Sequence, residues 1–556
     1  LSVTFLTVVI CSFVWFQDEK PTYFPEDLAK RQANSANGYI EFMQTVKGNQ
    51  NTHDVDPALV LASRKQADRL PKGKASLNLN WQFKGPDNIG GRTRALIMDR
   101  NNPNHLYAGG VAGGVFESFD GAISWQPYDT DFKVNNISCM TQAIDGSVYV
   151  GTGGHFEGAS SNSARGYFFV GTGIHKLTGN GTFEQVIAPT TRLTPVVDYA
   201  TVGEIVADPT NANILHVAMN EGYRILTYNQ DSLKWLESTP FVPGGSKKCN
   251  DIDISDDGQN IIVTFNAAIY VSNDGGATFT ETTPNTNSSL GRIECDIAPS
   301  DKNIMYAGIA TNQGCLEGFY RSQDGGNNWE PIGAGDGSFD PYANFGVNCQ
   351  GGWDNMIEVF PDDPGKLVVG GVSLWRWTQS SVDPSPSNGS WERIDLTVEF
   401  TASGDLIPNY VHADKHNMVF DPRDSDIAYI ASDGGITKST DFNNGIPTYR
   451  VHNYKYGVTQ FYGIDVNAKD IVLGGTQDNG SFLVGLEFNN NLGAIEVLSG
   501  DGFDAAMSII DPSIGVAASQ FNRLGRIQGI GTTSGNSNLT AADIVSTNAF
   551  LGGLCA

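Results

Sequence analysis

Positive charge is scarce in this chain. Its 35 Lys and Arg residues stand against 61 Asp and Glu residues, which gives a formal net charge of −26 at pH 7 and a pI of about 4.6. A protein of this charge is repelled by nucleic acids and by anionic membrane surfaces. We therefore expect no nucleic-acid partner, and we interpret the acidity first as a solubilising surface.

Two common catalytic motifs are absent. The sequence contains no Gly-x-Ser-x-Gly nucleophile elbow and no His-Glu-x-x-His zinc-binding pattern. Their absence argues against a serine hydrolase of the α/β type and against a zinc protease.

Long hydrophobic runs are also missing, apart from residues 1–16. This uncharged run is followed directly by Gln17-Asp18-Glu19-Lys20, and it is shorter than the roughly 20 residues of a membrane span. Residues 1–19 are thus either a signal peptide or a retained hydrophobic anchor, held by a membrane or by a partner chain. Both alternatives predict an exported protein, extracellular or on the cell surface. Because the sequence starts without Met, we expect residues to be missing upstream.

Cysteine is sparse, with seven residues in 556. Cys315 and Cys349 fall in long loops that we expect to open on the same face, which predicts a disulfide between them. Cys249 and Cys295 form a weaker candidate pair, and Cys139 fits a buried thiol.

Glycine, in contrast, is abundant, and it marks a repeated pattern. Segments 118–125, 272–279 and 322–329 each run from Ser through Asp-Gly to a closing Trp or Phe. Their Asp residues, Asp120, Asp274 and Asp324, are 154 and then 50 residues apart, about three units and one unit of a module of roughly 50 residues. That length suits a blade of four antiparallel strands.

The pattern resembles the Asp-box, or BNR repeat, of sialidase, sortilin and xyloglucanase propellers. In these turns glycine permits positive φ and the Asp carboxylate accepts backbone N–H groups. The resemblance implies an all-β propeller of seven or more four-stranded blades. It also implies a structural role for Asp120, Asp274 and Asp324, on the face away from a binding site.

The chain divides into four parts. After residues 1–19, residues 20–80 form a helical segment, with a helix start at Asp56-Pro57. Residues 81–455 carry about seven strand-turn-strand units. Residues 456–556 add two degenerate units, which are either further blades of one larger ring or the start of a second propeller. We expect the natural chain to extend past residue 556.

Loops that precede first strands, and loops between second and third strands, converge on one mouth of a propeller. Four such segments are rich in polar residues: 85–94, 411–416, 432–435 and 475–480. These segments, with GPDNIGGRTRA, HADKHNMVFDP, ASDGGITKSTD and GGTQDNGS as their motifs, resemble a family of exported sialidase- or sortilin-like propellers. Many members are classed as glycosyl hydrolases, and many carry a C-terminal type IX secretion sorting domain. The resemblance spans roughly residues 40–530.

The mouth segments supply the candidate ligand-binding residues. His412, Asp414 and His416 alternate, so on a strand they would share one face; metal binding, a polar ligand site and a structural role all remain open. Arg92 and Arg94 alternate in the same way, and they either grip a carboxylate or sulfate or form salt bridges to Asp433 or Asp478. The remaining candidates are the stacking aromatic Trp353 and the turn residues Gln477 and Asp478.

Calcium at the Gln477–Asp478 turn is the only cofactor considered, and we assign no metal site. A glycosidase requires two carboxyl groups about 5–5.5 Å or 6.5–9.5 Å apart. The candidates for such a pair are Asp354, Asp414, Asp433 and Asp478. The Arg-Ile-Pro motif of sialidases is missing, so a sialidase is not expected, and a xyloglucanase would need two complete propellers.

From the sequence we expect an exported cell-surface propeller that serves as a binding or assembly module for a protein or glycan partner. The alternative is a polysaccharide glycoside hydrolase that uses a carboxyl pair at the mouth. A third hypothesis is a structural subunit anchored through its N-terminus.

Overall fold

The computed structural model describes residues 55–70, 82–129, 134–157, 169–193, 196–239, 248–333, 339–344, 348–382, 385, 388–397, 407–485, 492–520, 523–530 and 544–547. The predicted signal peptide or anchor, residues 1–19, and most of the segment 20–80 lie outside the described residues.

The described strands form nine four-stranded antiparallel sheets, each built from four strands that are consecutive in the sequence. The first is β1 (Thr93–Asp99), β2 (Asn102–Gly110), β3 (Gly114–Ser118) and β4 (Gln126–Pro127). The second is β5 (Ile137–Gln142), β6 (Val148–Thr152), β7 (Ile174–Leu177) and β8 (Phe183–Ile187). The third is β11 (Val202–Ala207), β12 (Ile214–Met219), β13 (Gly222–Asn229) and β14 (Lys234–Ser238).

The fourth sheet is β15 (Cys249–Ile254), β16 (Ile261–Phe265), β17 (Ala268–Ser272) and β18 (Thr280–Glu281). The fifth is β19 (Leu290–Ile297), β20 (Met305–Thr311), β21 (Leu316–Ser322) and β22 (Glu330–Pro331). The sixth is β25 (Met356–Val359), β26 (Lys366–Gly370), β27 (Leu374–Gln379) and β28 (Gly389–Arg393). The seventh is β29 (Lys415–Asp421), β30 (Asp424–Ser432), β31 (Gly435–Ser439) and β32 (Arg450–Val451).

The eighth sheet is β33 (Phe461–Val466), β34 (Val472–Thr476), β35 (Gly480–Val484) and β36 (Ile495–Leu498). The ninth is β37 (Gly502–Met507), β38 (Gly515–Ser519), β39 (Arg523–Ile527) and β40 (Ile544–Thr547). Two short ribbons complete the strands: β9 (Thr190–Leu193) with β10 (Val196–Asp198), and β23 (Ala343–Asn344) with β24 (Asn348–Cys349).

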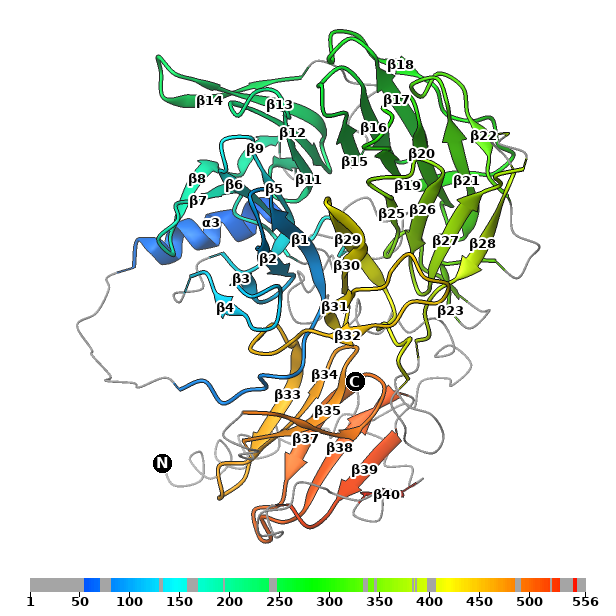
Figure 1. Cartoon of the computed structure of the whole chain (residues 1–556). Helices are drawn as coiled ribbons and strands as arrows, with labels where there is room; N and C mark the ends of the chain where they lie inside the picture. Colours follow the sequence, from blue (N-terminus) through cyan, green and yellow to red (C-terminus); the bar gives the residue numbers. More distant parts are fainter. Residues whose placement is uncertain are drawn as a thin grey trace, which may run out of the picture.

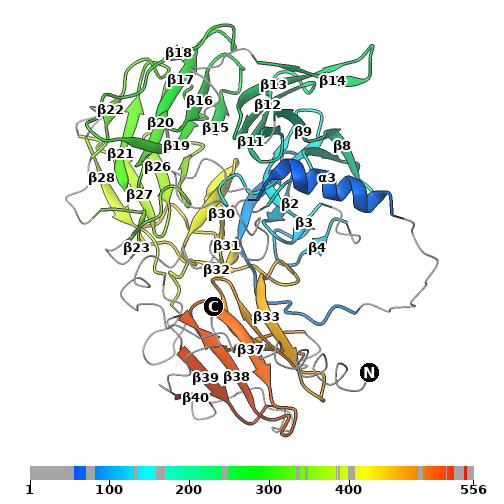
Figure 2. The ribbon, with the colours of Figure 1, turned by 180° about the vertical axis from the view of Figure 1, so that it is seen from behind.

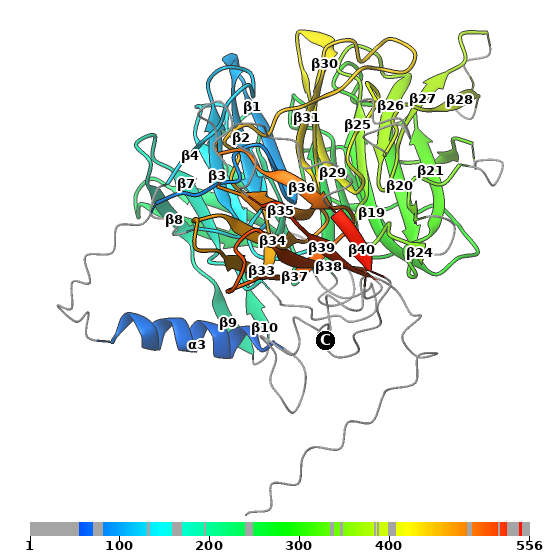
Figure 3. The same ribbon diagram turned by 90° about the horizontal axis from the view of Figure 1, so that it is seen from below.

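The first seven sheets close a ring. Their innermost strands pack in the order β1, β5, β11, β15, β19, β25 and β29, and β29 returns to pack against β1. The predicted all-β propeller is therefore confirmed. The eighth and ninth sheets pack on each other through β33, β34 and β37, outside this ring. Figure 1 shows them, in orange to red, as a unit beside the ring, and Figure 3 shows the same unit from below, in front of the ring.

The seam between the seventh and first sheets is an apolar core. Leu96 and Phe116 from the first sheet pack with Tyr429 and Ile436 from the seventh, and each is almost fully buried. Trp125 joins this core, and its Nε1 donates a hydrogen bond to the carbonyl oxygen of His452 at 2.8 Å. Burial of side chains this large contributes about 1.5–3 kcal/mol each, so this core favours closure of the ring.

The three Asp-box turns lie between the third and fourth strands of their sheets. In one of them, Ser272 Oγ donates to Asp274 Oδ1 at 2.8 Å, and Asp274 Oδ1 accepts the backbone N–H of Thr278 at 2.9 Å. Gly275 and Gly276 have φ of 69° and 83°, which explains the glycine pair. Asp120 and Asp324 make the same bonds, and Asp441 makes them across a longer turn. These carboxylates act within their own turns.

Carboxylates also cover the inner strand edges that face the axis of the ring. Asp251 and Asp253 on β15 accept the backbone N–H groups of Cys295 and Ile297 on β19, at 2.8 and 2.7 Å. Asp296 on β19 accepts the N–H of Val359 on β25 at 2.5 Å. An inner strand has no ladder partner on this edge, so a side chain from the previous sheet supplies the missing acceptor.

The helix α3 (Pro57–Asp68) packs against β10. Figure 2 shows the helix, in blue, on the side of the ring that carries β8 and β9. Asp56 is its N-cap and accepts from the N–H of Ala58 at 2.8 Å, so the predicted helix start is confirmed. Arg64 ties the helix to the ring by donating to the carbonyl oxygens of Val170 and Gly171. No helix in the described part of the chain is both long and apolar enough to cross a membrane.

Cys315 and Cys349 form a disulfide. Cys139, Cys249 and Cys295 are buried free thiols. The weaker candidate pair, Cys249 with Cys295, was wrong. Cys249 lies in the core between the third and fourth sheets, whereas Cys295 lies in the core between the fourth and fifth, so a sheet separates them.

Candidate functional site

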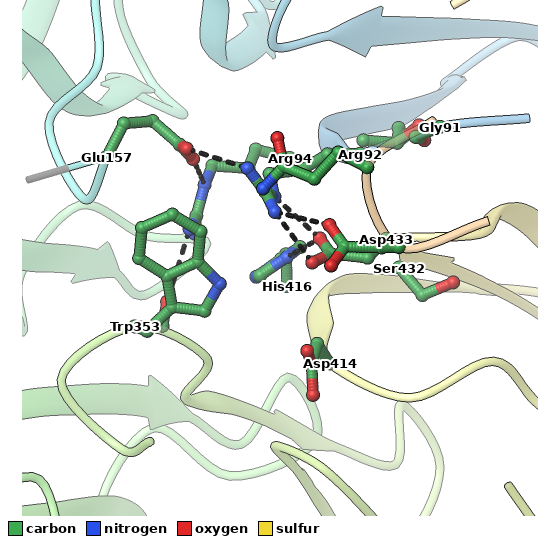
Figure 4. A network of polar contacts seen from close by, with 12 residues as sticks. Gly91, Arg92, Arg94, Glu157, Trp353, Asp414, His416, Ser432 and Asp433 are labelled. Atoms are coloured by element: carbon green, nitrogen blue, oxygen red, sulfur yellow. Dashed lines mark hydrogen bonds and ion pairs between the residues drawn. The ribbon is translucent and has the colours of Figure 1, made fainter. Parts of the chain in front are cut away.

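Polar side chains from distant parts of the sequence meet at the mouth of the ring, where the inner strands begin. Figure 4 shows them in close-up, and the dashed lines mark their hydrogen bonds and ion pairs. The labelled side chains that carry the argument are Arg92, Arg94, Glu157, Trp353, Asp414, His416 and Asp433.

Arg92 is the centre of this network. Its Nε and Nη2 donate to the two carboxylate oxygens of Asp433 at 2.8 and 2.9 Å, a bidentate pair. Its Nη1 donates to Glu157 at 3.0 Å and its Nη2 to Asp478 at 2.6 Å. With 2% of its side chain exposed, Arg92 is held by carboxylates of the protein itself, so its donors are already engaged. Of the two alternatives for this residue, the salt bridge is the one observed.

Arg94 shares a partner with Arg92. Its Nε donates to Glu157 Oε1 at 2.6 Å, and its Nη2 donates to the carbonyl oxygen of Trp353 at 3.3 Å. The ring of Trp353 lies over both guanidinium groups, with its centroid 4.5 Å from Cζ of Arg92 and 5.3 Å from that of Arg94. Glu157 was not among the predicted site residues. Its sequence signal is weak, because it follows β6 in a unit that has no Asp-box.

His416 and Asp433 form a buried pair. His416 Nε2 lies 2.6 Å from Asp433 Oδ1. Burial, reinforced by the charge of Arg94, lowers the pKa of His416 to about 4. Burial alone would raise the pKa of Asp433, but Arg92 and His416 outweigh it and hold that pKa well below its usual range. Asp433 is therefore the ionised carboxylate of the mouth.

His412, Asp414 and His416 do not share one face, contrary to the expectation from their alternation. Strand β29 begins only at Lys415, and Asp414 adopts a left-handed conformation with φ of 62°. His412 Nε2 lies 3.0 Å from the carbonyl oxygen of Asp478, and Asp414 Oδ1 accepts from Gln350 Nε2 at 3.1 Å. In the described ranges, no group of three or more His, Cys, Asp or Glu residues is placed to hold a metal ion.

The turn between β34 and β35 brings the eighth sheet into this mouth. Asn479 Nδ2 donates to the carbonyl oxygen of Asp433 at 2.9 Å, and the carboxylate of Asp478 reaches Arg92. With its amide oxygen turned toward Arg92, Gln477 accepts from Nη2 at 2.8 Å. The side-chain oxygens of Gln477 and Asp478, which were considered as calcium ligands, thus accept hydrogen bonds from Arg92. Calcium binding at this turn stays a prediction.

Asp354 is the most deeply buried carboxyl group of the mouth. Its side chain is 0% exposed, and neither carboxyl oxygen has a hydrogen-bond partner. Burial, and then the neighbouring Asp414 and Asp433, raise its pKa well above the usual range. The pKa of Asp414 is raised by burial and by Asp433. Burial and Asp433 also raise the pKa of Asp478, although Arg92 opposes them.

Five carboxyl groups gather at the mouth, those of Glu157, Asp354, Asp414, Asp433 and Asp478. Arg92 and Arg94 pair with three of them, those of Glu157, Asp433 and Asp478. Asp354 and Asp414 form no ion pair with either arginine in the described residues, and burial with like charge nearby raises the pKa of both. The carboxyl groups of the mouth are therefore not equivalent: Arg92 favours the ionised form of Asp433, whereas the surroundings of Asp354 and Asp414 favour the neutral form.

The disulfide anchors one wall of the mouth. Cys349 directly precedes the turn Gln350–Asp354, in which the N–H groups of Trp353 and Asp354 both donate to the carbonyl oxygen of Gln350, at 2.6 and 3.0 Å. The N–H of Gly351 donates to Gly314 at 2.8 Å, next to Cys315. The disulfide and the hydrogen bond to Gly314 therefore hold in place the turn that carries three side chains of the site, those of Gln350, Trp353 and Asp354.

Two other aromatic side chains at this end of the ring, Phe156 and Tyr342, are packing residues. Phe156 is buried, with the Arg292 guanidinium 3.6 Å from its ring centroid and the Lys248 ammonium 4.4 Å from it. Tyr342 is fully buried and donates to Asn355 Oδ1 at 2.6 Å. Trp353 keeps part of its surface exposed.

One cavity of about 410 Å³ lies at the opposite end of the inner strands. It is lined by residues after β15 and β19, including Asp256, Asp257 and Lys302. None of the mouth residues lines it, so it does not form part of this site.

No family model matches the chain, and no curated protein matches it. Among solved structures, the GH74 enzyme of Niastella koreensis is similar, with a TM-score of 0.57 and 15% identity over 84% of this chain and 68% of that chain. An ancestral GH74 enzyme has a TM-score of 0.58 and 16% identity, over 84% and 63%. The GH74 xyloglucanase of Xanthomonas campestris has a TM-score of 0.50 and 13% identity, over 82% and 74%.

The chain thus spans 63–74% of the length of these proteins, and the low identity limits the similarity to the fold. Shared fold does not establish shared function. This chain is a β-propeller protein whose architecture is similar to that of GH74 enzymes.

Proposed function

We propose that this protein is a glycoside hydrolase that cleaves a polysaccharide at the mouth of the seven-sheet ring, with Asp414 and Asp478 as the reacting carboxyl groups. The observation that carries the proposal is the group of carboxyls gathered at the mouth, in which Arg92 holds the pKa of Asp433 low while burial and Asp433 raise the pKa of Asp414 and Asp478. Neighbouring carboxyl groups whose pKa values are shifted in opposite directions are typical of sites for acid–base catalysis.

The chemistry of glycoside hydrolysis supports this choice. It needs two carboxyl groups beside the glycosidic bond, one to protonate the leaving oxygen and one to act as base or nucleophile. Asp414 belongs to the ring and Asp478 to the eighth sheet, and both are partly exposed. A substrate at the junction of the two units would therefore meet both.

Backbone conformation supports the same two residues. Asp414 and Asp478 have φ of 62° and 63°, a left-handed conformation found in only a few per cent of non-glycine residues. Such conformations gather at functional sites, where the surrounding structure holds them. Gln350 holds the side chain of Asp414 and Arg92 holds that of Asp478.

The substrate class follows from the remaining contacts. Trp353 offers a partly exposed ring for stacking on a sugar. Arg92 and Arg94 are already paired with carboxylates of the protein, so they do not bind the carboxylate of an acidic sugar. The names of the similar structures, two GH74 enzymes and a GH74 xyloglucanase, also favour a polysaccharide substrate. We further propose that the protein acts outside the cell, without a required cofactor.

The test is incubation of the purified protein with neutral polysaccharides and sialylated glycans, read by mass spectrometry for new products. We expect products from a neutral polysaccharide and none from sialylated glycans. Asp414→Asn and Asp478→Asn should each lower turnover by about 100-fold or more. Glu330→Gln, at an exposed position on β22, is the matched control and should keep full activity. Retention on a glycan without any products would contradict hydrolysis and favour a binding module.

A further inference from the structure

Asp354 is a buried carboxyl group without a donor. The other carboxyls of the mouth each have one: Arg92 donates to Asp433 and Asp478, and Gln350 donates to Asp414. Neither oxygen of Asp354 has a partner, and no part of its side chain is exposed. An ionised carboxylate in such a place would lose its hydration without compensation, at a cost that proteins avoid by keeping the proton.

The neighbour of this protonated carboxyl is Asp414. Asp414 raises the pKa of Asp354, and Gln350 links the two residues, because its carbonyl oxygen accepts the N–H of Asp354 at 3.0 Å and its amide donates to Asp414 at 3.1 Å. A protonated carboxyl has one O–H to donate, and a carboxyl oxygen of Asp414 can accept it. Two carboxyl groups that share a site hold one proton more tightly than either alone.

The charges around Asp414 come from several elements. His412 and Lys415 favour its ionised form, whereas Asp433 and Asp478 favour its neutral form. Lys415 is 2.5 Å from the buried Asp395, which offsets its charge. The groups that disfavour ionisation therefore prevail, in agreement with the raised pKa of Asp414.

We propose that Asp354 and Asp414 share one proton, and that Asp354 is a positioning residue which keeps Asp414 in its acid form as the proton donor to the leaving sugar. The role in catalysis rests on the proposed function, whereas the shared proton does not. In the reaction the Asp414 O–H bond breaks and the proton goes to the glycosidic oxygen as the carbon–oxygen bond breaks. Water adds its hydroxyl to the new sugar end, its remaining proton goes to the carboxylate of Asp478 as base, and exchange with solvent then removes a proton from Asp478 and restores one to Asp414.

The kinetic test is Asp354→Asn. Asparagine keeps the shape of the side chain, but its N–H group donates to Asp414 and stabilises the ionised form. The basic limb of the pH–rate profile should move down by about 1–3 pH units. Hydrolysis of an aryl glycoside of the released oligosaccharide, whose leaving group needs no proton, should be retained while polysaccharide turnover falls. Asp340→Asn, in the neighbouring loop, is the control and should leave the limb in place. Equal losses on both substrates without a shift of the limb would overturn the role of Asp354.

The shared proton has its own test, which requires no activity. Infrared difference spectra at neutral pH should show a protonated-carboxyl band that Asp354→Asn removes and that Asp414→Asn shifts in frequency, because the acceptor of the shared proton changes from a carboxyl to an amide. A band that Asp414→Asn leaves unshifted would overturn the pair, and this measurement stands even if Asp354→Asn does not fold. If the wild-type protein hydrolyses nothing, the proposed function fails, while the spectra still decide on the pair.

Discussion

The guanidinium of Arg92, which directly precedes the first strand of the ring, lies 2.6 Å from the carboxylate of Asp478 in a turn of the eighth sheet. The two residues are 386 positions apart. The same guanidinium binds Asp433 from the seventh sheet and Glu157 from the second. One buried side chain therefore fixes the seam of the ring and also the place where the second unit joins it.

Arg92→Lys should strongly destabilise the protein. A lysine ammonium cannot reproduce the bidentate fork and cannot reach three carboxylates at once, so buried negative charge is left without a partner. We expect a loss of about 3–5 kcal/mol in the free energy of unfolding, measured with urea. Arg450→Lys, at an exposed position on β32, is the control and should change little. A free energy of unfolding for Arg92→Lys within about 0.5 kcal/mol of wild type would show that the ion pairs of Arg92 are not needed for stability.

Stability should fall as the pH rises through the neutral range. Burial raises the pKa of Asp251 and Asp253 to about 6, and burial with Asp251 raises that of Glu294 to about 8. These raised values mean that the stabilising protons are fully bound below about pH 4 and are lost between about pH 4 and 8. The free energy of unfolding should drop by about 1.4 kcal/mol per pH unit for each proton retained by the folded protein. Unfolding measured from pH 4.5 to 8.5 checks this, and a flat profile would contradict it.

Substitutions of Asp253 can separate two properties of a carboxyl group on an inner strand: its hydrogen bond to the next sheet and its ionisation. Asp253→Asn keeps an oxygen for the N–H of Ile297 and removes the ionisable group, so it should flatten the pH dependence without loss of stability at pH 8. Asp253→Leu leaves that N–H bare and should cost about 1–3 kcal/mol at every pH. If both variants behave alike, the carboxylate does not serve as the acceptor for the neighbouring strand.

Loss of the disulfide should loosen the wall of the mouth. The bond joins Cys315 to Cys349, 34 residues apart, next to the turn that carries Trp353. The double substitution Cys315→Ser with Cys349→Ser should lower stability by about 2–4 kcal/mol. It should also change the tryptophan fluorescence, because Trp353 loses its fixed place over Arg92. Cys139→Ser, a buried thiol outside the mouth, controls for the loss of a cysteine. Unchanged fluorescence in the double variant would contradict the anchoring role.

Much of the fold could be predicted because its signals are local. The Asp-box turns depend on residues within a span of eight, and the helix start depends on Asp56 and the proline after it. Arg92 and Asp433 could be grouped because propeller connectivity brings their loops to one mouth, and Asp478 could be added because its turn also follows a second strand of a repeated unit. This argument needed only the order of the strands and no distances.

The rest of the site depends on contacts that leave no local pattern. Glu157 follows a strand in a unit without an Asp-box, so nothing in its neighbourhood distinguishes it from a solvent-exposed acid. Asp414 was placed on a strand by alternation, whereas its left-handed backbone becomes evident only from coordinates. The carboxylates of Asp251 and Asp253 could have been noticed as acids inside apolar strands, but their partners belong to the next sheet.

The seam described between β29 and β1 has a consequence for how the chain folds. All four strands of every sheet in the ring are consecutive in sequence, so no strand from one end of the chain completes a sheet at the other. The ring is an open chain of sheets whose ends adhere through side chains and through a few backbone hydrogen bonds outside the strands, such as that from the N–H of Trp125 to the carbonyl oxygen of Tyr454 at 3.0 Å. During synthesis, the apolar surface around Leu96 and Phe116 stays exposed until the segment that contains Tyr429 and Ile436 has been made and packs on it. More than 300 residues separate its appearance from its burial, which makes this face the natural point for a chaperone to shield.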